Sequence, residues 1–437
     1  MLAGIAAAAL LAVAAPGPAS AAAPEGYCQS APVSVPTIAD VPWQVRAYDA
    51  GARLWPFSTG AGVTVAVLST GVDAAHPQLV GKVATGADLA GGQGVGNADC
   101  VGIGTASASV IAGQKIPGVG FYGLAPDVQI IPFRVSVSLA AGADNVREPK
   151  PDVVAEGIDA AVAAGADIIL VPHALVNTTG KLEKATSDAI AAGRVVVAPV
   201  GDEHPPDLEP MLSTPADLTP YPASYPGVIA VGAVGPSGER SPSSQIGDYV
   251  DLVAPGVDVT AAAPDGQQTY TTTTISASYV AATAALLLAD QRFGYDALSG
   301  QQKADAIAGR LVATASPNGG GDPMLGYGAG VLDPYRALNE PLASAVPTGG
   351  APFTPYSPSD AEVAAAAAEE HARTSFDAVT GFGILALVLG GVAVWTVRRT
   401  RAGSARVATS TVAHRSEDDL PEFVPGSALF TPKSVED

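Results

Sequence analysis

Side chains able to act as a general base are scarce in this sequence. Only five of its 437 residues are histidines, namely His76, His173, His204, His371 and His414. A hydroxyl nucleophile needs such a base within hydrogen-bond reach. One arrangement pairs Thr274 with His173 or His204 and uses Asp202 to orient the imidazole. The alternative, which we favour, is that each histidine is a surface or structural residue, because a new base rarely lies in reach by chance.

The sequence does not indicate a metal site, a cofactor site or a nucleic-acid-binding surface. We expect no cofactor and no metal, since no group of His, Cys and Asp residues has the spacing of a ligand set. Asp73 and Asp99 are better explained as residues that cap or turn the chain. The formal net charge of −20 argues against nucleic acid as a partner, because phosphates require a basic face.

The beginning of the sequence predicts export. Residues 3–15 form an apolar run, and Ala19-Ser20-Ala21 is a cleavage site of the small-residue kind, although no Lys or Arg precedes the run. We therefore expect a signal peptide over residues 1–21. In an exported protein an even number of cysteines favours pairing, so Cys28 and Cys100 are expected to form a disulfide.

A second apolar segment predicts a membrane anchor. Residues 378–397 carry no charge, and at ~1.5 Å per residue such a helix spans a hydrocarbon core of ~30 Å. Three arginines follow at once, at positions 398, 399 and 401, which places the C-terminal tail in the cytoplasm. We expect a single-pass protein of the cell membrane whose large domain is extracytoplasmic.

Between these signals, apolar strands alternate with helical stretches. Continuous β-branched runs predict buried strands over Val63–Leu68, Val128–Val135, Ala166–Val171, Val195–Val200, Val228–Val234 and Val250–Val253. Helical patterns cover Val153–Ala164, Glu183–Ala192, Ser276–Gln291 and Gln301–Thr314. This alternation predicts an α/β fold with a parallel sheet flanked by helices. Ligands and chemistry then belong at the carboxyl ends of the strands.

Five segments, in the same order, resemble the subtilase family of serine proteases. They are GAGVTVAVLSTGVDAAHPQL (60–79), DCVGIGTASASVIAG (99–113), VVVAPVGDE (195–203), TTTISASYVAATAALLL (272–288) and GYGAGVLDPYRAL (326–338). Within that family the chain looks most like the mycosins, the proteases associated with type VII secretion. The signal peptide, the Pro-rich extension with Cys28, the pair Asp99-Cys100 and the C-terminal membrane segment carry this resemblance.

The resemblance and the composition together divide the chain into six parts. We expect a signal peptide (1–21), a Pro-rich N-terminal extension (22–44), a subtilase-like domain (45–340), a linker (341–377), a transmembrane helix (378–397) and a cytoplasmic tail (398–437).

The residues that carry catalysis in subtilases are replaced at every matching position. The resemblance places Ser69 in the role of the Asp, Ile103 in that of the His and Thr274 in that of the Ser. Asp202 stands where the family has the Asn that stabilises the oxyanion. A hydroxyl cannot balance an imidazolium, isoleucine cannot accept a proton, and a carboxylate repels a developing oxyanion.

The sequence therefore predicts an inactive subtilase. The interpretation that we favour is a membrane-anchored, mycosin-like pseudoprotease that acts as a structural or regulatory component of a type VII secretion complex. The resemblance then implies partners within that membrane complex, and a peptide could occupy the cleft. The alternative is an active subtilisin-like serine endopeptidase with unorthodox catalytic residues. A titratable base facing Thr274 would favour this alternative.

Overall fold

A computed structural model of the chain describes residues 37–91, 94–137, 149–203, 218–264, 266–317 and 326–342. The predicted signal peptide, Cys28, most of the linker, the predicted transmembrane helix and the tail lie outside these ranges. No helix within the ranges is both long enough and apolar enough to cross a bilayer.

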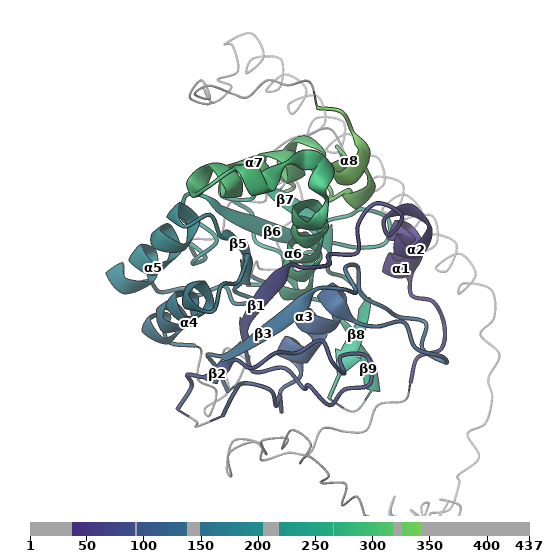
Figure 1. Cartoon of the computed structure of the whole chain (residues 1–437), viewed down its shortest axis with the longest axis horizontal. Coiled ribbons are helices and arrows are strands. Elements are labelled where there is room, and N and C mark those ends of the chain that lie inside the picture. The colour runs from purple at the N-terminus through teal and green to yellow at the C-terminus, as the bar shows by residue number, and fades with distance from the viewer. Residues whose placement is uncertain are drawn as a thin grey trace, which may run out of the picture. The chain divides into compact units, whose positions relative to one another are not determined.

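The centre of the domain is a parallel sheet (Figure 1). Its strands are β1 (Thr64–Ser69), β2 (Ala87–Asp88), β3 (Gln129–Arg134), β4 (Ile168–Leu170), β5 (Val195–Pro199), β6 (Val228–Val234) and β7 (Leu252–Pro255). They lie in the order β2-β3-β1-β4-β5-β6-β7, and each neighbouring pair is parallel. Parallel strands need crossover connections, and helices supply three of them here, after β2, β3 and β4.

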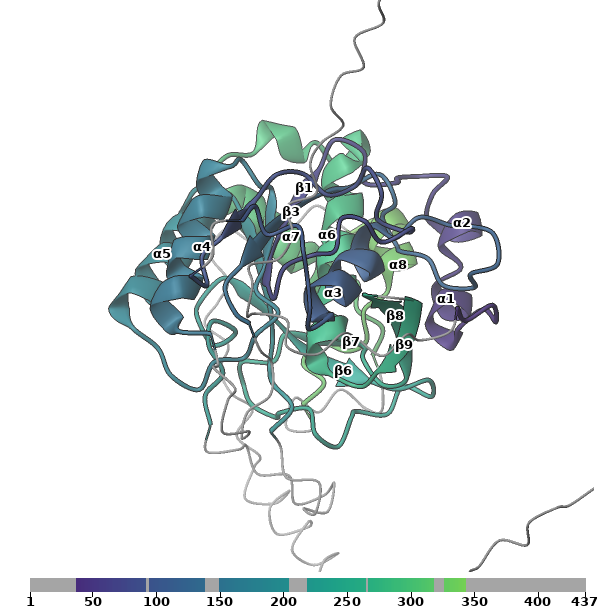
Figure 2. The same ribbon diagram turned by 90° about the horizontal axis from the view of Figure 1, so that it is seen from below.

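Helices cover both faces of this sheet (Figures 1 and 2). They are α1 (Trp43–Tyr48), α2 (Ala50–Arg53), α3 (Ile103–Ala112), α4 (Pro151–Ala163), α5 (Gly180–Ala191), α6 (Thr273–Ala289), α7 (Gln301–Ala313) and α8 (Pro334–Asn339). Short 3₁₀ turns at Gln291–Phe293 and Tyr295–Ala297 connect α6 to α7. One core packs α3 and α6 against the sheet, and a second packs α4 and α5 against the opposite face.

Strand β1 shows why the sequence folds into these layers. Val65 and Val67 belong to the core with α3 and α6, while Ala66 and Leu68 belong to the core with α4 and α5. Successive side chains of a strand point to opposite faces, so a strand covered on both sides is apolar throughout. Helix α6 is likewise buried on nearly all sides, which explains why it lacks a polar face.

An antiparallel hairpin, β8 (Val259–Ala263) and β9 (Gly266–Tyr270), lies beside α3. The N-terminal segment is tied to it. The amide of Ile38 donates to Gln267 Oε1 at 3.1 Å, and Gln44 Nε2 donates to the Thr260 carbonyl at 2.9 Å. Trp43 Nε1 donates to the Asp258 carbonyl at 3.0 Å. Residues 37–44 of the predicted extension are thus attached to the domain.

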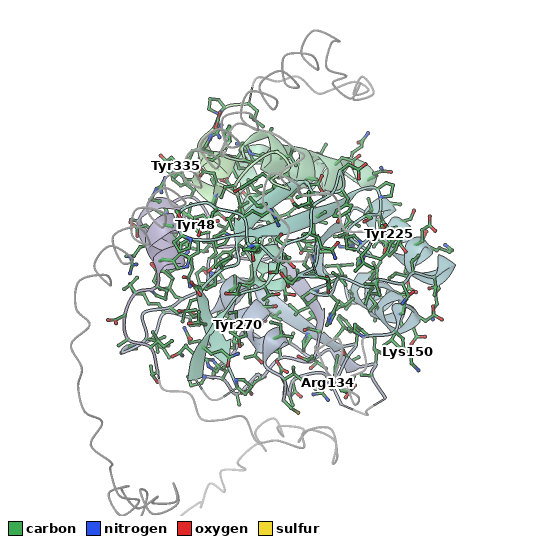
Figure 3. The ribbon with its side chains drawn as sticks, turned by 180° about the vertical axis from the view of Figure 1, so that it is seen from behind. Tyr48, Arg134, Lys150, Tyr225, Tyr270 and Tyr335 are labelled. Carbon is green, nitrogen blue, oxygen red and sulfur yellow. The ribbon has the colours of Figure 1, made fainter. Side chains whose placement is uncertain are left out.

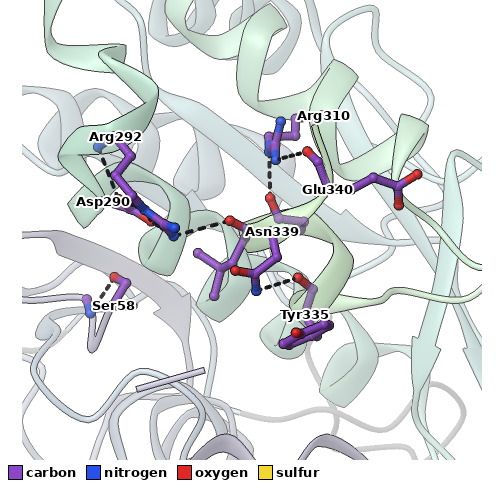
Figure 4. A network of polar contacts seen from close by, with 10 residues as sticks. Ser58, Asp290, Arg292, Arg310, Tyr335, Asn339 and Glu340 are labelled. Carbon is purple, nitrogen blue, oxygen red and sulfur yellow. Dashed lines mark hydrogen bonds and ion pairs between the residues drawn. The ribbon is translucent and has the colours of Figure 1, made fainter. Parts of the chain in front are cut away.

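Two arginines hold the C-terminal end of α8 (Figure 4). Arg310 donates to the Glu340 carbonyl at 2.8 Å, and Arg292 donates to the Leu338 carbonyl at 3.2 Å. Arg292 also forms an ion pair with Asp290. The last carbonyls of a helix have no intrahelical partner and carry partial negative charge, so cations are stabilising there. This end of the domain is therefore fixed immediately before the predicted linker.

The predicted strands and helices are found within a few residues of their expected ends. The sequence pattern did not predict β2, α3, the β8–β9 hairpin or the short helices at either end. Helix α3 was missed because every one of its residues is buried, which removes the polar face that gives a helical period.

Candidate functional site

A cleft of about 370 Å³ opens at the carboxyl edge of the sheet. Its walls include the segment after β4, the segment after β5 and the first residues of α3 and α6. Ile103, His173, Asp202 and Thr274 all line it. Tyr270, the last residue of β9, which Figure 3 labels, also lines it. The structure thus gathers four of the sequence-predicted positions around one space.

Thr274, in the first turn of α6, has both of its polar groups engaged. Its hydroxyl donates to the carbonyl of Pro172 at 3.2 Å. Its amide donates to the hydroxyl of Thr272, the N-cap residue, at 3.2 Å. A hydroxyl becomes nucleophilic by passing its proton to a base, and a peptide carbonyl does not act as one. The amide, a possible oxyanion donor, is used by the helix cap.

Asp202 is held at the N-terminus of α6. Its carboxylate accepts from the Thr272 hydroxyl at 2.6 Å and from the Thr273 amide at 2.9 Å. Burial raises the pKa of this carboxyl above its ordinary value, and the hydrogen bonds from Thr272 and Thr273 partly offset that rise. A carboxylate suits this place because a helix N-terminus carries partial positive charge and free N–H donors. The donors are therefore already occupied by an anion of the protein itself.

The backbone conformation of Gly201 lets Asp202 approach the first residues of α6. Gly201 has φ of +98°, a region that glycine adopts readily, and its amide donates to the Thr273 hydroxyl at 3.2 Å. A Cβ added at Gly201 would lie 2.5 Å from a Glu203 carboxylate oxygen. The turn after β5 thus brings Asp202 close to the first residues of α6.

His173 is the only described histidine in the cleft wall. It is 7% exposed, and its Nε2 has no hydrogen-bond partner. Burial lowers the pKa of this imidazole from 6.5 to about 4, so the ring is neutral at physiological pH. Thr274 donates to the neighbouring carbonyl of Pro172, not to this ring.

Ser69 does not line the cleft, whereas Ile103, at the start of the neighbouring helix α3, does. Ser69 ends β1, is fully buried, and its Oγ has no hydrogen-bond partner. Ile103 begins α3 and is 5% exposed, as part of the hydrophobic core. A Cβ added at Gly104 would lie 3.2 Å from the Cβ of Ser69, so the end of β1 touches the first turn of α3. Neither side chain can take or hold a proton as imidazole or carboxylate does.

Asp99 organises this corner, in agreement with its predicted role as a cap. One carboxylate oxygen accepts from the Thr70 hydroxyl at 2.8 Å and from the amides of Val101 and Gly102 at 3.0 and 2.9 Å. The other accepts from the amide and the hydroxyl of Thr105 at 2.9 and 2.8 Å. Asp99 thereby satisfies one amide of the first turn of α3, that of Thr105, together with two amides of the preceding turn, and ties them to Thr70 at the end of β1. Asp73, as expected, accepts a turn bond from Ala75 at 2.9 Å.

His76, the other described histidine, does not line the cleft. His76 Nε2 donates to the Gly266 carbonyl at 3.1 Å, its Nδ1 accepts from the Gln78 amide, and burial lowers its pKa. It fixes the β8–β9 hairpin, which is the structural role expected.

His204, His371 and His414 lie outside the described residues, as does Cys28. Cys100 is not a free thiol, but its pairing with Cys28 stays a prediction. Within the described residues no group of His, Cys, Asp or Glu could hold a metal ion.

Sequence reasoning overlooked two groups of the cleft. Glu203 lines it and accepts from Gln245 Nε2 at 2.9 Å. Tyr270 lines it and donates to the Ala262 carbonyl at 3.0 Å. The position of Glu203 directly after Asp202 could have suggested its place, whereas nothing near Tyr270 in the sequence indicates a site.

Comparison with known proteins decides the family. A model of the subtilase family, Peptidase_S8, matches residues 60–330. The chain belongs to the subtilase family. This subtilase is 32% identical over 345 residues to Mycosin-1 of Mycolicibacterium smegmatis, which covers 69% of this chain and 73% of that protein. Mycosin-1 of Mycobacterium tuberculosis is 32% identical over 340 residues, or 68% and 73% of the two chains.

Solved structures agree with this placement. The crystal structure of MycP1 from the ESX-1 type VII secretion system is 29% identical, with a TM-score of 0.57, and covers 71% of this subtilase and 89% of that chain. MycP3 protease from the type VII (ESX-3) secretion system is 27% identical, with a TM-score of 0.54, over 69% and 89%. The subtilisin-like α/β fold predicted from the sequence is thus confirmed, and the mycosins are homologues of this chain.

Proposed function

We propose that this subtilase is a pseudoprotease: a mycosin-like domain that keeps the fold and the cleft but does not hydrolyse peptides. We further propose that a single membrane helix anchors it beside a type VII secretion complex, in which it has a structural or regulatory role. The homologous MycP1 and MycP3, which belong to type VII secretion systems, support the second proposal, together with the apolar segment at 378–397.

The observation that carries the loss of catalysis is the hydrogen bond from Thr274 Oγ1 to the carbonyl of Pro172. The hydroxyl in the nucleophile's place is directed at a carbonyl, and the residue in the base's place, Ile103, is part of the apolar core. Asp202 occupies the end of α6 with negative charge, where a transition state would need donors.

The rate losses caused by removing single catalytic residues in subtilisin indicate how much activity this chain would lack. In subtilisin, removal of the Ser or the His lowers turnover by about 10⁶, and removal of the oxyanion Asn by about 10²–10³. These effects are not additive, but a subtilisin without its triad keeps a rate enhancement of only about 10³–10⁴ over the uncatalysed reaction. We infer that a chain altered at all four positions has no useful protease activity.

A fluorophosphonate probe and a broad peptide library test the proposal on the purified full-length chain. The wild-type chain should label no more than Thr274→Ala, and it should leave the library intact. Thr271→Ala is the matched control, because it removes an exposed hydroxyl from the same run of threonines. Labelling that disappears in Thr274→Ala but persists in Thr271→Ala would establish a working nucleophile and end the pseudoprotease proposal.

Restoration gives a second test. Thr274→Ser alone should leave the chain inactive, since a serine without its base is an unactivated alcohol. The quadruple variant with Ser69→Asp, Ile103→His, Thr274→Ser and Asp202→Asn supplies all four roles and should gain labelling above the single variant.

A further inference from the structure

A small pocket, which we call the α8 pocket, lies where the N-terminal helices meet the start of α8. Its volume is about 140 Å³, and its walls include Tyr48, Arg53, Leu332 and Tyr335. It shares no lining residue with the cleft. Tyr48 and Tyr335, which Figure 3 labels, lie at the same edge of the domain. The α8 pocket is therefore a second place at which the domain could bind a ligand.

The walls of the α8 pocket combine aromatic rings with hydrogen-bond donors. The guanidinium of Arg53 lies over the ring of Tyr335, 4.7 Å from its centroid, and the ring of Phe57 meets Tyr335 edge-on at 6.4 Å. Tyr335 is 38% exposed, and Arg53 is exposed as well. Neither the Tyr335 hydroxyl nor the Arg53 guanidinium forms a hydrogen bond or an ion pair with any described residue. These O–H and N–H groups are therefore available to the acceptors of a ligand.

The carboxylate of Asp333, which also lines the α8 pocket, is already occupied. It accepts from the Ser316 hydroxyl at 2.9 Å and from the Arg336 amide at 3.0 Å, and in this way it caps α8. A cationic ligand therefore gains little here. An apolar ligand rich in carbonyl oxygens fits the rings and the donors better.

A proline-rich segment in the polyproline II conformation has this chemistry. Its rings pack on aromatic side chains, and its carbonyls have no internal hydrogen-bond partners. Proline also lacks an N–H group, so such a segment needs donors from its partner rather than acceptors. The volume of the α8 pocket is large enough for a pyrrolidine ring.

The chain carries such a segment shortly after α8. Pro352, Pro355 and Pro358 follow one another at intervals of three residues. Polyproline II has three residues per turn, so prolines at this interval share one face in that conformation. Ten positions separate Leu342, the last described residue, from Pro352 and span up to ~33 Å. Helix α8 has six residues and is only ~9 Å long, so the segment can reach the α8 pocket.

We propose that the α8 pocket binds residues 352–358 of the same chain as a polyproline II segment, with proline rings against Tyr335 and carbonyls accepting from Arg53 and Tyr335. This assignment does not depend on whether the cleft cuts peptides. Docking would fix the first part of the predicted linker to the domain. Only residues 359–377 would then remain as a free tether to the predicted membrane helix.

Proteolysis of the full-length chain in detergent tests the assignment. Chymotrypsin cuts after Phe353 and Tyr356, inside the segment, and a glutamate-specific protease cuts after Glu369, beyond it. A synthetic peptide of residues 343–377 gives the intrinsic rate at each bond. At the effective concentration of about 1 mM that a short linker provides, an interaction with a dissociation constant of about 0.1 mM protects about tenfold. Cleavage after Phe353 and Tyr356 should be about tenfold slower in the chain than in the peptide, whereas cleavage after Glu369 should be equally fast.

Variants on both sides locate the contact. Tyr335→Ala should bring cleavage after Phe353 and Tyr356 back to the rate of the peptide. Tyr225→Ala is the matched control, because it removes another partly exposed tyrosine that Figure 3 shows across the domain, and it should leave the protection unchanged. Replacing all three prolines, Pro352→Ala, Pro355→Ala and Pro358→Ala, in the chain and in the peptide should remove the difference between the two without altering the domain.

The outcomes also separate this assignment from the proposed function. Equal rates in the chain and the peptide overturn the assignment and leave the α8 pocket to another occupant. Protection that persists in Tyr335→Ala, or after replacement of the three prolines, overturns it as well. A chain that cuts itself before any protease is added contradicts the pseudoprotease proposal instead.

Discussion

The protonation state of His173 distinguishes a pseudoprotease from an active protease with unorthodox catalytic residues. A working base for Thr274 would have a pKa near the operating pH, whereas burial lowers the pKa of this imidazole from 6.5 to about 4. The folded chain keeps the ring neutral, while the unfolded chain protonates it below about pH 6.5. Unfolding therefore takes up a proton between about pH 6.5 and about pH 4, and the free energy of unfolding must fall as the pH falls through this window.

The size of this effect follows from the shift in pKa. A difference of about 2.5 in pKa corresponds to about 3 kcal/mol of unfolding free energy once the pH is below both pKa values. About 2 kcal/mol of this stability should be lost between pH 7 and pH 5, because that interval covers most of the window. The ring is nearly fully buried, so solvent screening does not reduce the expected magnitude greatly.

Urea unfolding measures the contribution of His173 to the pH dependence of the unfolding free energy. The wild-type chain and His173→Gln are unfolded at a series of pH values, and circular dichroism follows the transition. Glutamine is polar and does not titrate, so the difference between the two curves isolates His173. The pKa of His76, which burial also lowers, affects both chains equally. The wild-type chain should lose about 2 kcal/mol more than the variant over this range. Parallel curves, or an imidazole that titrates near pH 7, would refute the reasoning and favour the unorthodox protease.

Three further predictions concern the rest of the chain. Asp99→Ala should lower the free energy of unfolding by about 3 kcal/mol, because it removes the buried acceptor of the Thr70 hydroxyl and of the Thr105 amide, and Asp99→Asn should cost less; equal urea midpoints for all three chains would contradict this. Cys28 and Cys100 should form a disulfide that contributes about 4 kcal/mol through loop closure, and mass-spectrometric mapping that finds two free thiols in exported protein would exclude it. Protease added to intact cells should remove the domain and spare the C-terminal tail; loss of the tail alone would reverse the topology predicted from residues 378–397.

The sequence by itself determined that the fold is a parallel sheet flanked by helices, and it located every strand of that sheet except β2. Runs such as Val195–Val200 and Val228–Val234 are apolar because strands covered on both faces have no exposed side. The same residues predict strands without any knowledge of their neighbours. Helix α3 could not be predicted, because all of its residues are buried and the sequence therefore lacks the alternation of polar and apolar residues that indicates a helix.

The sequence also determined which chemical groups are missing from the site. Ile103 has no proton to exchange in any fold, and Ser69 cannot carry a carboxylate's charge. The resemblance in the five segments placed these residues at the carboxyl edge of the sheet, where the structure indeed brings Ile103, Asp202 and Thr274 to one cleft.

Only the tertiary structure decided how the remaining polar groups are used. Thr274 donates to the carbonyl of Pro172, 102 positions away, and Asp202 accepts from the amide of Thr273, 71 positions away. No local pattern can predict such pairs, because they depend on how closely the ends of β4 and β5 approach the first turn of α6. The unpartnered Nε2 of His173 is likewise a consequence of packing: the sequence supplies the imidazole, and burial among the walls of the cleft makes it neutral.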